Sequence, residues 1–336
     1  NNIVTIQPDS LRILHNPLTG WVLYASMGVD AAAFWAQYDH MYIPELGHNV
    51  SVTDYAHTLY IRASWTDFNP QEDVYGWKID SNLRAYIEGA YQRNMRLAFR
   101  VVVDSRDKRT EFTPQFVKDA GAKGFMNKGK WSPYSDDPVF QKYYTKFVKA
   151  LAKDFNDPSK VEFIDGFGLG KWGEYHTMIY STGDDTPKKA VFDWVTDIYS
   201  QAFDKVPVVI NYHRWIGAGK DWVDDEHFAA DSEEMLEEAI KKGYSLRHDA
   251  FGMTTYYGSW ERRFAKKYRN ICPIIMEGGW IVKSHSYWQD PRGYRKDSHE
   301  DVRRGEFDDS KEAHVNMMDF RFGDTESWFK DAFDLV

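Results

Sequence analysis

The chain has 336 residues, a length that a barrel of eight strands and eight helices uses as a single unit. Its 42 Lys and Arg residues and 51 Asp and Glu residues give a formal net charge of −9. This balance excludes the basic surface of a nucleic-acid-binding protein and a polybasic membrane anchor, so we expect a neutral or weakly charged partner.

Aromatic residues make up 16% of the chain, with 13 Trp and 21 Tyr. Clefts that bind sugars present aromatic faces to their ligands, although a large domain also places many aromatic side chains in its core. The composition therefore favours a carbohydrate as the ligand.

The sequence offers few indications of cellular location. Cys272 is the only cysteine, which excludes an intrachain disulfide, and its neighbours in CPIIM predict a buried, unreactive thiol. The chain has no signal peptide and no apolar run of about 18 residues, so we expect no insertion into a membrane. The chain begins at Asn1 without a methionine, as a trimmed or a mature form would, and we expect a secreted or periplasmic protein.

Eight short runs rich in branched and aromatic residues predict the strands of one sheet. Several runs are continuously apolar, as in RLAFRVVV and VPVVIN, which is typical of strands buried on both faces. The predicted strands are residues 21–27, 58–64, 96–103, 161–169, 206–212, 250–256, 271–277 and 314–320.

Helical periodicity fills most of the intervals between these runs. Residues 81–94, for example, place Leu83 and Ile87 on one face. Thr-Pro opens the segment 186–203, and the segment 232–242 is acidic at its start and basic at its end, as the helix dipole favours. The predicted helices are residues 81–94, 139–155, 186–203, 232–242 and 324–334.

Alternation of strands and helices predicts a parallel sheet, and eight strands predict an α/β fold of the (β/α)8 TIM-barrel type. A doubly wound open sheet is the second architecture, but the glycines of GFGLGKWG lack the spacing of a dinucleotide-binding fingerprint. Neither internal repeats nor a linker divides the chain. We therefore expect a single catalytic domain over residues 1–336.

Two of the predicted loops are long. Residues 104–137 follow the third strand and residues 278–313 follow the seventh, and both are polar and rich in Trp, Tyr, Arg, Lys and His. Loops of this length in a compact domain are usually functional or disordered. Since the loops that follow barrel strands stand on the catalytic face, we expect these two to wall a cleft.

Two glutamates lie where predicted strands end. Glu174 follows the fourth strand in GKWGEYH, and Glu277 ends the seventh in PIIMEGGW. The carboxyl ends of barrel strands meet at one rim, so we expect the two side chains to converge there. A carboxyl group among apolar neighbours is costly unless it has a function. The pair therefore predicts acid/base chemistry, of the kind that cleaves a glycosidic bond.

An acid/base glutamate after strand four and a nucleophile on strand seven are the arrangement of the clan A, or 4/7, glycoside hydrolases, which this chain resembles. The segment ASWTDFNPQEDVYGWKID is similar to the passage after strand two in β-galactosidase-like members, and NPLTGW is similar to barrel-opening segments of uncharacterised bacterial relatives. The resemblance implies that Glu174 is the general acid/base and Glu277 the nucleophile. The sequence departs from the clan's pattern at Gly173, where many members carry an asparagine that contacts the sugar 2-hydroxyl group.

The resemblance also implies a reaction. A retaining glycosidase forms a covalent glycosyl intermediate on Glu277, while Glu174 first protonates the leaving group and then deprotonates water. The implied substrate is a β-linked poly- or oligosaccharide, and the reaction requires no cofactor.

Further residues are predicted at the same rim. Tyr256 resembles the clan's tyrosine that donates a hydrogen bond to the nucleophile, with Tyr257 as the alternative, and Trp280 is expected to stack on a sugar ring. Arg62 and Arg100, inside strands, are expected to steady a carboxylate or to form structural ion pairs. The predicted substrate-binding residues are Trp65, Arg100, Trp172, His176, Asn211, His213, Tyr256 and Trp280.

Two other functions fit the sequence less well. A metal-dependent barrel hydrolase needs a His-x-His pair near the first strand, which residues 21–27 lack, and Glu174, His176 and His213 have weak ligand spacing, so no metal site is predicted. A carbohydrate-binding barrel without catalysis retains a cleft, but loss of catalysis often removes one glutamate, and both are present.

Overall fold

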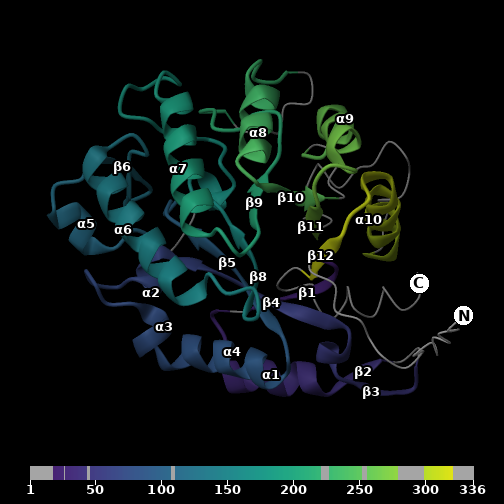
Figure 1. Cartoon of the computed structure of the whole chain (residues 1–336). Helices are drawn as coiled ribbons and strands as arrows, with labels where there is room; N and C mark the ends of the chain where they lie inside the picture. Colours follow the sequence, from purple (N-terminus) through teal and green to yellow (C-terminus); the bar gives the residue numbers. More distant parts are fainter. Residues whose placement is uncertain are drawn as a thin grey trace, which may run out of the picture.

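The computed structural model describes residues 18–25, 27–43, 46–106, 110–220, 227–251, 256–278 and 299–320. They form a closed barrel of eight parallel strands with helices on its outside (Figure 1). The predicted (β/α)8 TIM-barrel fold is confirmed. In order around the barrel, the strands are β1 (Gly20–Tyr24), β4 (Ala56–Ser64), β5 (Arg96–Val102), β8 (Val161–Asp165), β9 (Val208–Asn211), β10 (Ser245–Phe251), β11 (Ile274–Gly278) and β12 (Met317–Phe320), which pairs with β1.

Helices connect most successive strands of the barrel. The longest, α6, is capped by Asp137, whose carboxylate accepts the Phe140 N–H at 2.8 Å, and begins with Pro138, which needs no hydrogen-bond acceptor there. The helices are α1 (Ala31–Asp39), α2 (Trp65–Phe68), α3 (Gly76–Ile79), α4 (Ser81–Gln92), α5 (Gln115–Asp119), α6 (Pro138–Phe155), α7 (Lys188–Ala202), α8 (Ser232–Lys241), α9 (Ser259–Tyr268) and α10 (His299–Ala313).

Short elements occupy the connections. The loop predicted over residues 104–137 contains α5 and the hairpin of β6 (Gly124–Asn127) and β7 (Lys130–Pro133), and the second part of the loop predicted over 278–313 is α10. A second hairpin joins β2 (Met41–Ile43) to β3 (His48–Val50). Two 3-10 turns complete the described elements, η1 (Val52–Asp54) and η2 (Lys171–Gly173). The helix predicted over 324–334 lies outside the described residues.

One strand prediction was misplaced. The sixth strand was expected over residues 250–256, whereas β10 begins at Ser245 and ends at Phe251. Its sequence, SLRHDAF, carries three polar residues in succession, so it lacks the apolar run by which the other strands were recognised. Tyr256 therefore does not end this strand but lies beyond it.

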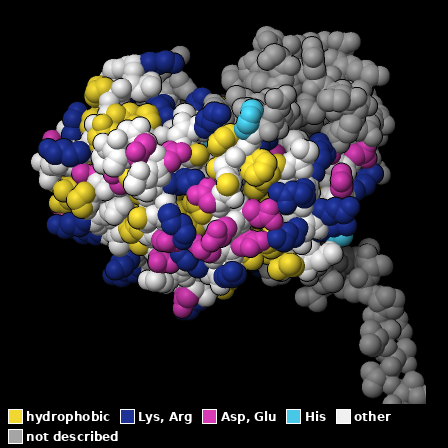
Figure 2. Space-filling view, turned by 90° about the horizontal axis from the view of Figure 1, so that it is seen from above, with side chains coloured by type: hydrophobic (Ala, Val, Ile, Leu, Met, Phe, Trp, Pro, Cys, Tyr) yellow, Lys and Arg dark blue, Asp and Glu magenta, His cyan; other side chains and the backbone are white. Residues whose placement is uncertain are grey.

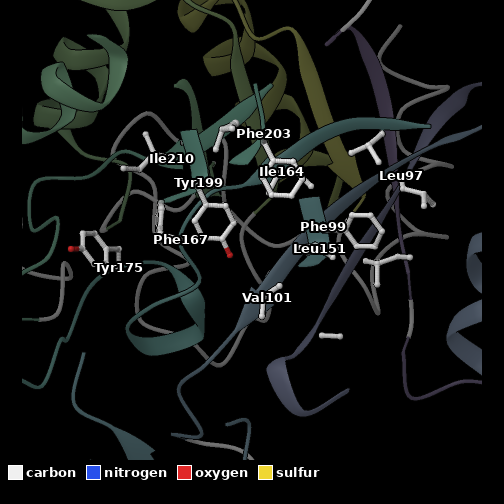
Figure 3. Close-up of a cluster of buried hydrophobic side chains, with 14 of the residues drawn as sticks. Leu97, Phe99, Val101, Leu151, Ile164, Phe167, Tyr175, Tyr199, Phe203 and Ile210 are labelled. Carbon is white, nitrogen blue, oxygen red and sulfur yellow. The ribbon is translucent and has the colours of Figure 1, made fainter. Parts of the chain in front are cut away.

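Apolar side chains pack between the sheet and the helices. Figure 3 shows part of this layer, where Phe99 of β5 and Ile164 of β8 lie near Leu151 of α6. All three are buried, at 0–1% exposure. On the surface shown in Figure 2, basic and acidic side chains are interspersed over the described part of the face, as expected from the modest net charge.

Inside the barrel, an apolar layer lies below a polar layer. Tyr60, Ala98, Phe163, Val209 and Ile275 belong to one buried interior cluster. Because strand side chains alternate between faces, the residue two positions later on each strand points the same way, nearer the carboxyl end. These residues are Arg62, Arg100, Asp165, Asn211 and Glu277. The strand period therefore places four charged side chains and one amide above an apolar layer.

Trp65 does not lie in this interior. It opens α2 outside the barrel, is fully buried, and its ring packs against those of Phe140, Tyr144 and Phe147 at centroid distances of 6.0, 5.2 and 5.8 Å. Its indole N–H donates to Asn69 Oδ1 at 3.3 Å. The structure thus places this predicted substrate-binding residue in the core beneath α6, because the turn into α2 directs the side chain outward.

Replacing Trp65 by alanine is expected to lower the free energy of unfolding by about 3–5 kcal/mol, because it opens a cavity among these rings. Tyr42, which is 55% exposed, is the control, and Tyr42→Ala is expected to change stability by about 0.5 kcal/mol or less. Urea unfolding followed by circular dichroism measures both. A loss at Trp65 as small as that at Tyr42 would contradict its placement in the core.

Candidate active site

Arg247 of β10 holds Glu277 from below the rim. Its Nη2 donates to Glu277 Oε2 at 2.7 Å, and its Nε donates to Asp249 Oδ1, also at 2.7 Å. All three side chains are at most 1% exposed. Hydrogen bonds between ionised partners are short and strong, and a buried carboxylate needs such a partner. The Glu277 carboxylate is therefore oriented by a charged donor on the neighbouring strand.

Arg100 of β5 contacts three carboxylates, but not equally. Its Nε donates to Asp165 Oδ2 at 2.7 Å, and its Nη2 lies 2.5 Å from Asp249 Oδ2. Its Nη1 lies 3.7 Å from Glu174 Oε1. The two aspartates engage most of this guanidinium, so Glu174 receives a longer contact that falls outside hydrogen-bond range.

Arg62 of β4 interacts electrostatically with both glutamates. Its Nη2 donates to the carbonyl of Trp172 at 2.7 Å, and its Nη1 donates to the Tyr24 hydroxyl at 3.2 Å. Burial alone would lower the pKa of Arg62, but Tyr24, Glu174 and Glu277 all act on it to raise that pKa. The structure therefore brings Glu174 and Glu277 to one region of the barrel interior, around a shared cation.

Glu174 is carried by a strained loop. Between Gly168 and Thr177 the backbone repeatedly enters the left-handed region, which side chains other than glycine rarely adopt. The non-glycine residues there are Trp172, Tyr175 and Thr177, with φ of 59°, 61° and 52°. Such conformations cost on the order of 1–3 kcal/mol each and persist where surrounding contacts over-determine them. A cluster of them is typical of functional sites.

Several hydrogen bonds hold this loop. The Tyr175 N–H donates to the Leu169 carbonyl at 2.9 Å, and the Gly217 N–H, from the loop after β9, donates to the Tyr175 carbonyl at 2.7 Å. The loops after β8 and β9 are thereby joined, and the backbone that carries Glu174 is fixed from two sides.

His213 fixes the same backbone. Its Nδ1 accepts the Trp215 N–H at 3.2 Å, so its hydrogen lies on Nε2, which donates to the Glu174 carbonyl at 2.9 Å. Burial, with a contribution from His176, holds the pKa of His213 well below its ordinary value. The imidazole is therefore neutral and acts on the Glu174 main chain; no contact to a ligand is needed to explain it.

His176 lies beside the Glu174 carboxyl group, and Trp172 packs on His176. His176 Nε2 lies 3.5 Å from Glu174 Oε2, and its Nδ1 shares a hydrogen bond with Thr177 Oγ1 at 2.7 Å. The Trp172 ring packs edge-on against His176 at 5.7 Å and is half-buried, with the Lys171 ammonium 4.3 Å from its centroid. Trp172 thus packs on the histidine that contacts Glu174 and is only half-buried.

The other predicted binding residues are placed differently. Asn211 is fully buried, and its Nδ2 donates to Asp249 Oδ2 at 3.2 Å, so it belongs to the interior polar layer. Tyr256 is buried beside Ala250, with the half-buried Trp215 packed against it. Trp280 lies outside the described residues.

Three residues of this site were missed by the sequence reasoning. Asp165, Arg247 and Asp249 are at most 3% exposed and contact one another across β8 and β10. A signal for the first existed, because Asp165 follows the apolar Phe163 by one strand period. No comparable signal marked Arg247 and Asp249, whose strand was misplaced.

The described part of the chain carries neither a metal cluster nor a membrane-spanning helix. There, no three His, Cys, Asp or Glu side chains are grouped so as to hold a metal ion. Among the described helices, none has the length and apolar character needed to cross a membrane.

Gly173 has a conformational reason to be glycine. Its φ is +76°, and a Cβ added there would lie 3.4 Å from Val102 and 3.5 Å from Arg100, which are ordinary contact distances. The backbone conformation, not lack of space, therefore disfavours a side chain at this position.

Comparison with known proteins shows likeness at the level of fold. No protein-family model and no curated protein matches the sequence. Among solved structures, endo-glycoceramidase II from Rhodococcus sp. is 11% identical with a TM-score of 0.51, covering 90% of this chain and 72% of that one. Xylanase TsXylA from Thermoanaerobacterium saccharolyticum is 8% identical with a TM-score of 0.54, covering 90% and 85%. Exo-β-1,4-mannosidase Op5Man5 from Opitutaceae bacterium strain TAV5 is 13% identical with a TM-score of 0.50, covering 93% and 55%.

These neighbours are a glycoceramidase, a xylanase and a mannosidase, and this chain shares their overall fold. At such low identities, the likeness concerns the barrel and its strand order and carries no residue roles to this chain.

Gly173→Ala is expected to lower the free energy of unfolding by about 1–2 kcal/mol, because alanine is strained in the left-handed region. Gly173→Asn is expected to lose less, since asparagine tolerates that region. Gly121, with φ of +97° and open space around it, is the matched control, and Gly121→Ala is expected to lose a similar amount. Urea unfolding of the variants tests this. An unchanged stability in Gly173→Ala would contradict the loop conformation.

Proposed function

We propose that the protein is a retaining glycoside hydrolase, with Glu277 as the nucleophile and Glu174 as the general acid/base. The observation that carries the proposal is the unequal environment of the two carboxyl groups. Glu277 accepts a charged hydrogen bond at 2.7 Å from Arg247, whereas the Arg100–Glu174 contact is 3.7 Å long. A carboxylate held by a cation is suited to attack, and one with a looser cationic contact is better suited to carry a proton.

The reaction has two steps. In the first, a Glu277 oxygen attacks the anomeric carbon, the bond to the leaving oxygen breaks, and Glu174 gives its proton to that oxygen. In the second, water attacks the same carbon, its proton passes to Glu174, and the bond between Glu277 and the sugar breaks. Two inversions retain the anomeric configuration, and no cofactor takes part.

The proposed substrate is a β-linked oligo- or polysaccharide. Trp172 is half-buried and packs on His176, which contacts Glu174, and an aromatic side chain there suits the apolar face of a sugar ring. Endo-glycoceramidase II, which shares the fold, has been captured as a lactosyl-enzyme intermediate. Stacking by Trp280, a β-galactosidase-like specificity and a secreted or periplasmic location are further parts of the proposal that follow from the sequence.

The roles of the two glutamates are tested with 2,4-dinitrophenyl and phenyl β-glycosides of glucose, galactose, mannose and xylose. Glu277→Ala is expected to lose hydrolysis of both leaving groups. Glu174→Ala is expected to lose about 10²–10⁴-fold with phenyl glycosides and far less with dinitrophenyl glycosides, whose leaving group needs no proton. Glu162→Gln, a buried glutamate near the opposite end of the barrel, is the matched control and is expected to stay active.

Azide, added as an external nucleophile, distinguishes the roles of Glu174 and Glu277 further. In Glu174→Ala it is expected to replace water on the glycosyl-enzyme and give the β-glycosyl azide, and in Glu277→Ala to enter from the opposite face and give the α-azide. Proton NMR of the products reads the configuration. Wild-type hydrolysis that survives both alanine substitutions would refute the assignment, and a protein that binds these sugars without hydrolysing them would be a carbohydrate-binding barrel instead.

A further inference from the structure

We infer that four buried side chains form an ionic network without net charge: Arg100, Arg247, Asp165 and Asp249. This network keeps Glu277 ionised and Glu174 protonated. Given the function proposed above, Arg247, Asp165 and Asp249 are then positioning residues for the reaction. None of the three was expected from the sequence.

The two aspartates bridge the two arginines. Asp165 Oδ2 accepts from Arg100 Nε at 2.7 Å and lies 3.3 Å from Arg247 Nε. Asp249 accepts from Arg247 Nε at 2.7 Å through Oδ1, and its Oδ2 lies 2.5 Å from Arg100 Nη2. Strands β5, β8 and β10 are thereby joined by two cations and two anions that balance.

Neutral side chains complete the network. The Tyr60 hydroxyl donates to Asp165 Oδ2 at 2.9 Å, and Asn211 Nδ2 donates to Asp249 Oδ2 at 3.2 Å. Burial holds the pKa of Tyr60 well above its ordinary value, so it remains a donor. Burial would raise the pKa of Asp249, but Arg100 and Arg247 lower it overall, so Asp249 remains an anion.

The balance has opposite consequences for the two glutamates. Asp165 and Asp249 neutralise the charge of Arg100. Arg100 therefore stabilises the ionised form of Glu174 only weakly, through a contact of 3.7 Å. Arg247 donates from Nη2 to Glu277 and from Nε to Asp249. In a buried site, where charges interact strongly, removing one member leaves an excess charge of known sign beside both glutamates.

Other charged and titratable groups also face the two carboxyls. Around Glu174 these are Arg62 of β4, His176 of its own loop and His213 after β9, which binds its main chain. Around Glu277, Arg62 and Tyr24 of β1 contribute in addition to Arg247. These groups are unchanged in the substitutions proposed below, so any shift reports the network.

An ion pair in the barrel can also be merely structural, and the chain contains an example whose arginine is half-buried. Arg96 and Glu162 lie on β5 and β8, the strands of Arg100 and Asp165, and their ion pair measures 2.9 Å. They occupy the other end of these strands. Arg96→Met therefore removes an arginine from the same sheet without touching the candidate site.

Arg247→Met leaves an excess negative charge beside Glu277, which favours the protonated, inactive nucleophile. The acidic limb of the kcat/KM profile is expected to move to higher pH by about 1 unit or more. Hydrolysis of phenyl and dinitrophenyl glycosides is expected to fall by similar factors, because the nucleophile serves both. Arg247→Lys keeps the charge and is expected to leave the acidic limb in place while lowering kcat.

Asp165→Asn leaves an excess positive charge that favours ionised Glu174, the inactive form of the acid. The alkaline limb is expected to move to lower pH by about 1 unit or more, and phenyl glycosides are expected to lose more rate than dinitrophenyl glycosides. Asp249→Asn is expected to shift the same limb in the same direction and serves as the second variant if Asp165→Asn fails to fold, as judged by circular dichroism.

The control separates the possible failures. Arg96→Met is expected to lose stability in urea and to keep both limbs of its pH profile. If Glu277→Ala and Glu174→Ala are inactive as proposed but the network variants keep wild-type limbs and leaving-group dependence, the network inference is wrong and the glycosidase proposal stands. If wild-type protein hydrolyses none of the glycosides, or Glu277→Ala is as active as wild type, both are wrong.

Discussion

The structure depends on one constraint: a charge that points into a closed barrel is buried and must be neutralised there. Each interior position recurs every second residue, and the polar residues Arg100, Asp165 and Glu277 each follow an apolar residue by that period. The apolar layer below excludes water, so each charge costs several kcal/mol unless it is paired. Pairing across neighbouring strands, such as Arg247 with Glu277, is therefore a condition for the barrel to fold as well as for its chemistry.

Glu174 reaches the same layer by a different route. It lies beyond β8 in a loop with several left-handed residues, so its position depends on contacts made by its neighbours. His213 binds its carbonyl, and the Gly217 N–H binds that of Tyr175. Glu277, the proposed nucleophile, is thus fixed by the sheet, and Glu174, the proposed acid, by a strained loop. The contact of the Glu174 carboxylate with Arg100, at 3.7 Å, is longer than that of Glu277 with Arg247, at 2.7 Å, as suits the proposed proton carrier.

The sequence predicted the barrel because parallel strands buried on both faces are continuously apolar, and the eight expected runs each overlap a strand. It also placed Glu174 and Glu277 at the correct strand ends. It failed where interior charge interrupts the pattern: SLRHDAF was not recognised as β10, so Arg247 and Asp249 were missed. Trp65 shows a second limit. A position just after a strand does not tell whether the side chain turns toward the barrel mouth or under a helix.

The interior network is neutral only when its arginines and aspartates are counted together. This restricts which substitutions the site can accept. A single substitution at Arg100, Asp165 or Asp249 leaves an uncompensated buried charge, whereas concerted changes that conserve the balance do not. The barrel thus constrains the sum of the charges more tightly than the identity of any residue that carries them.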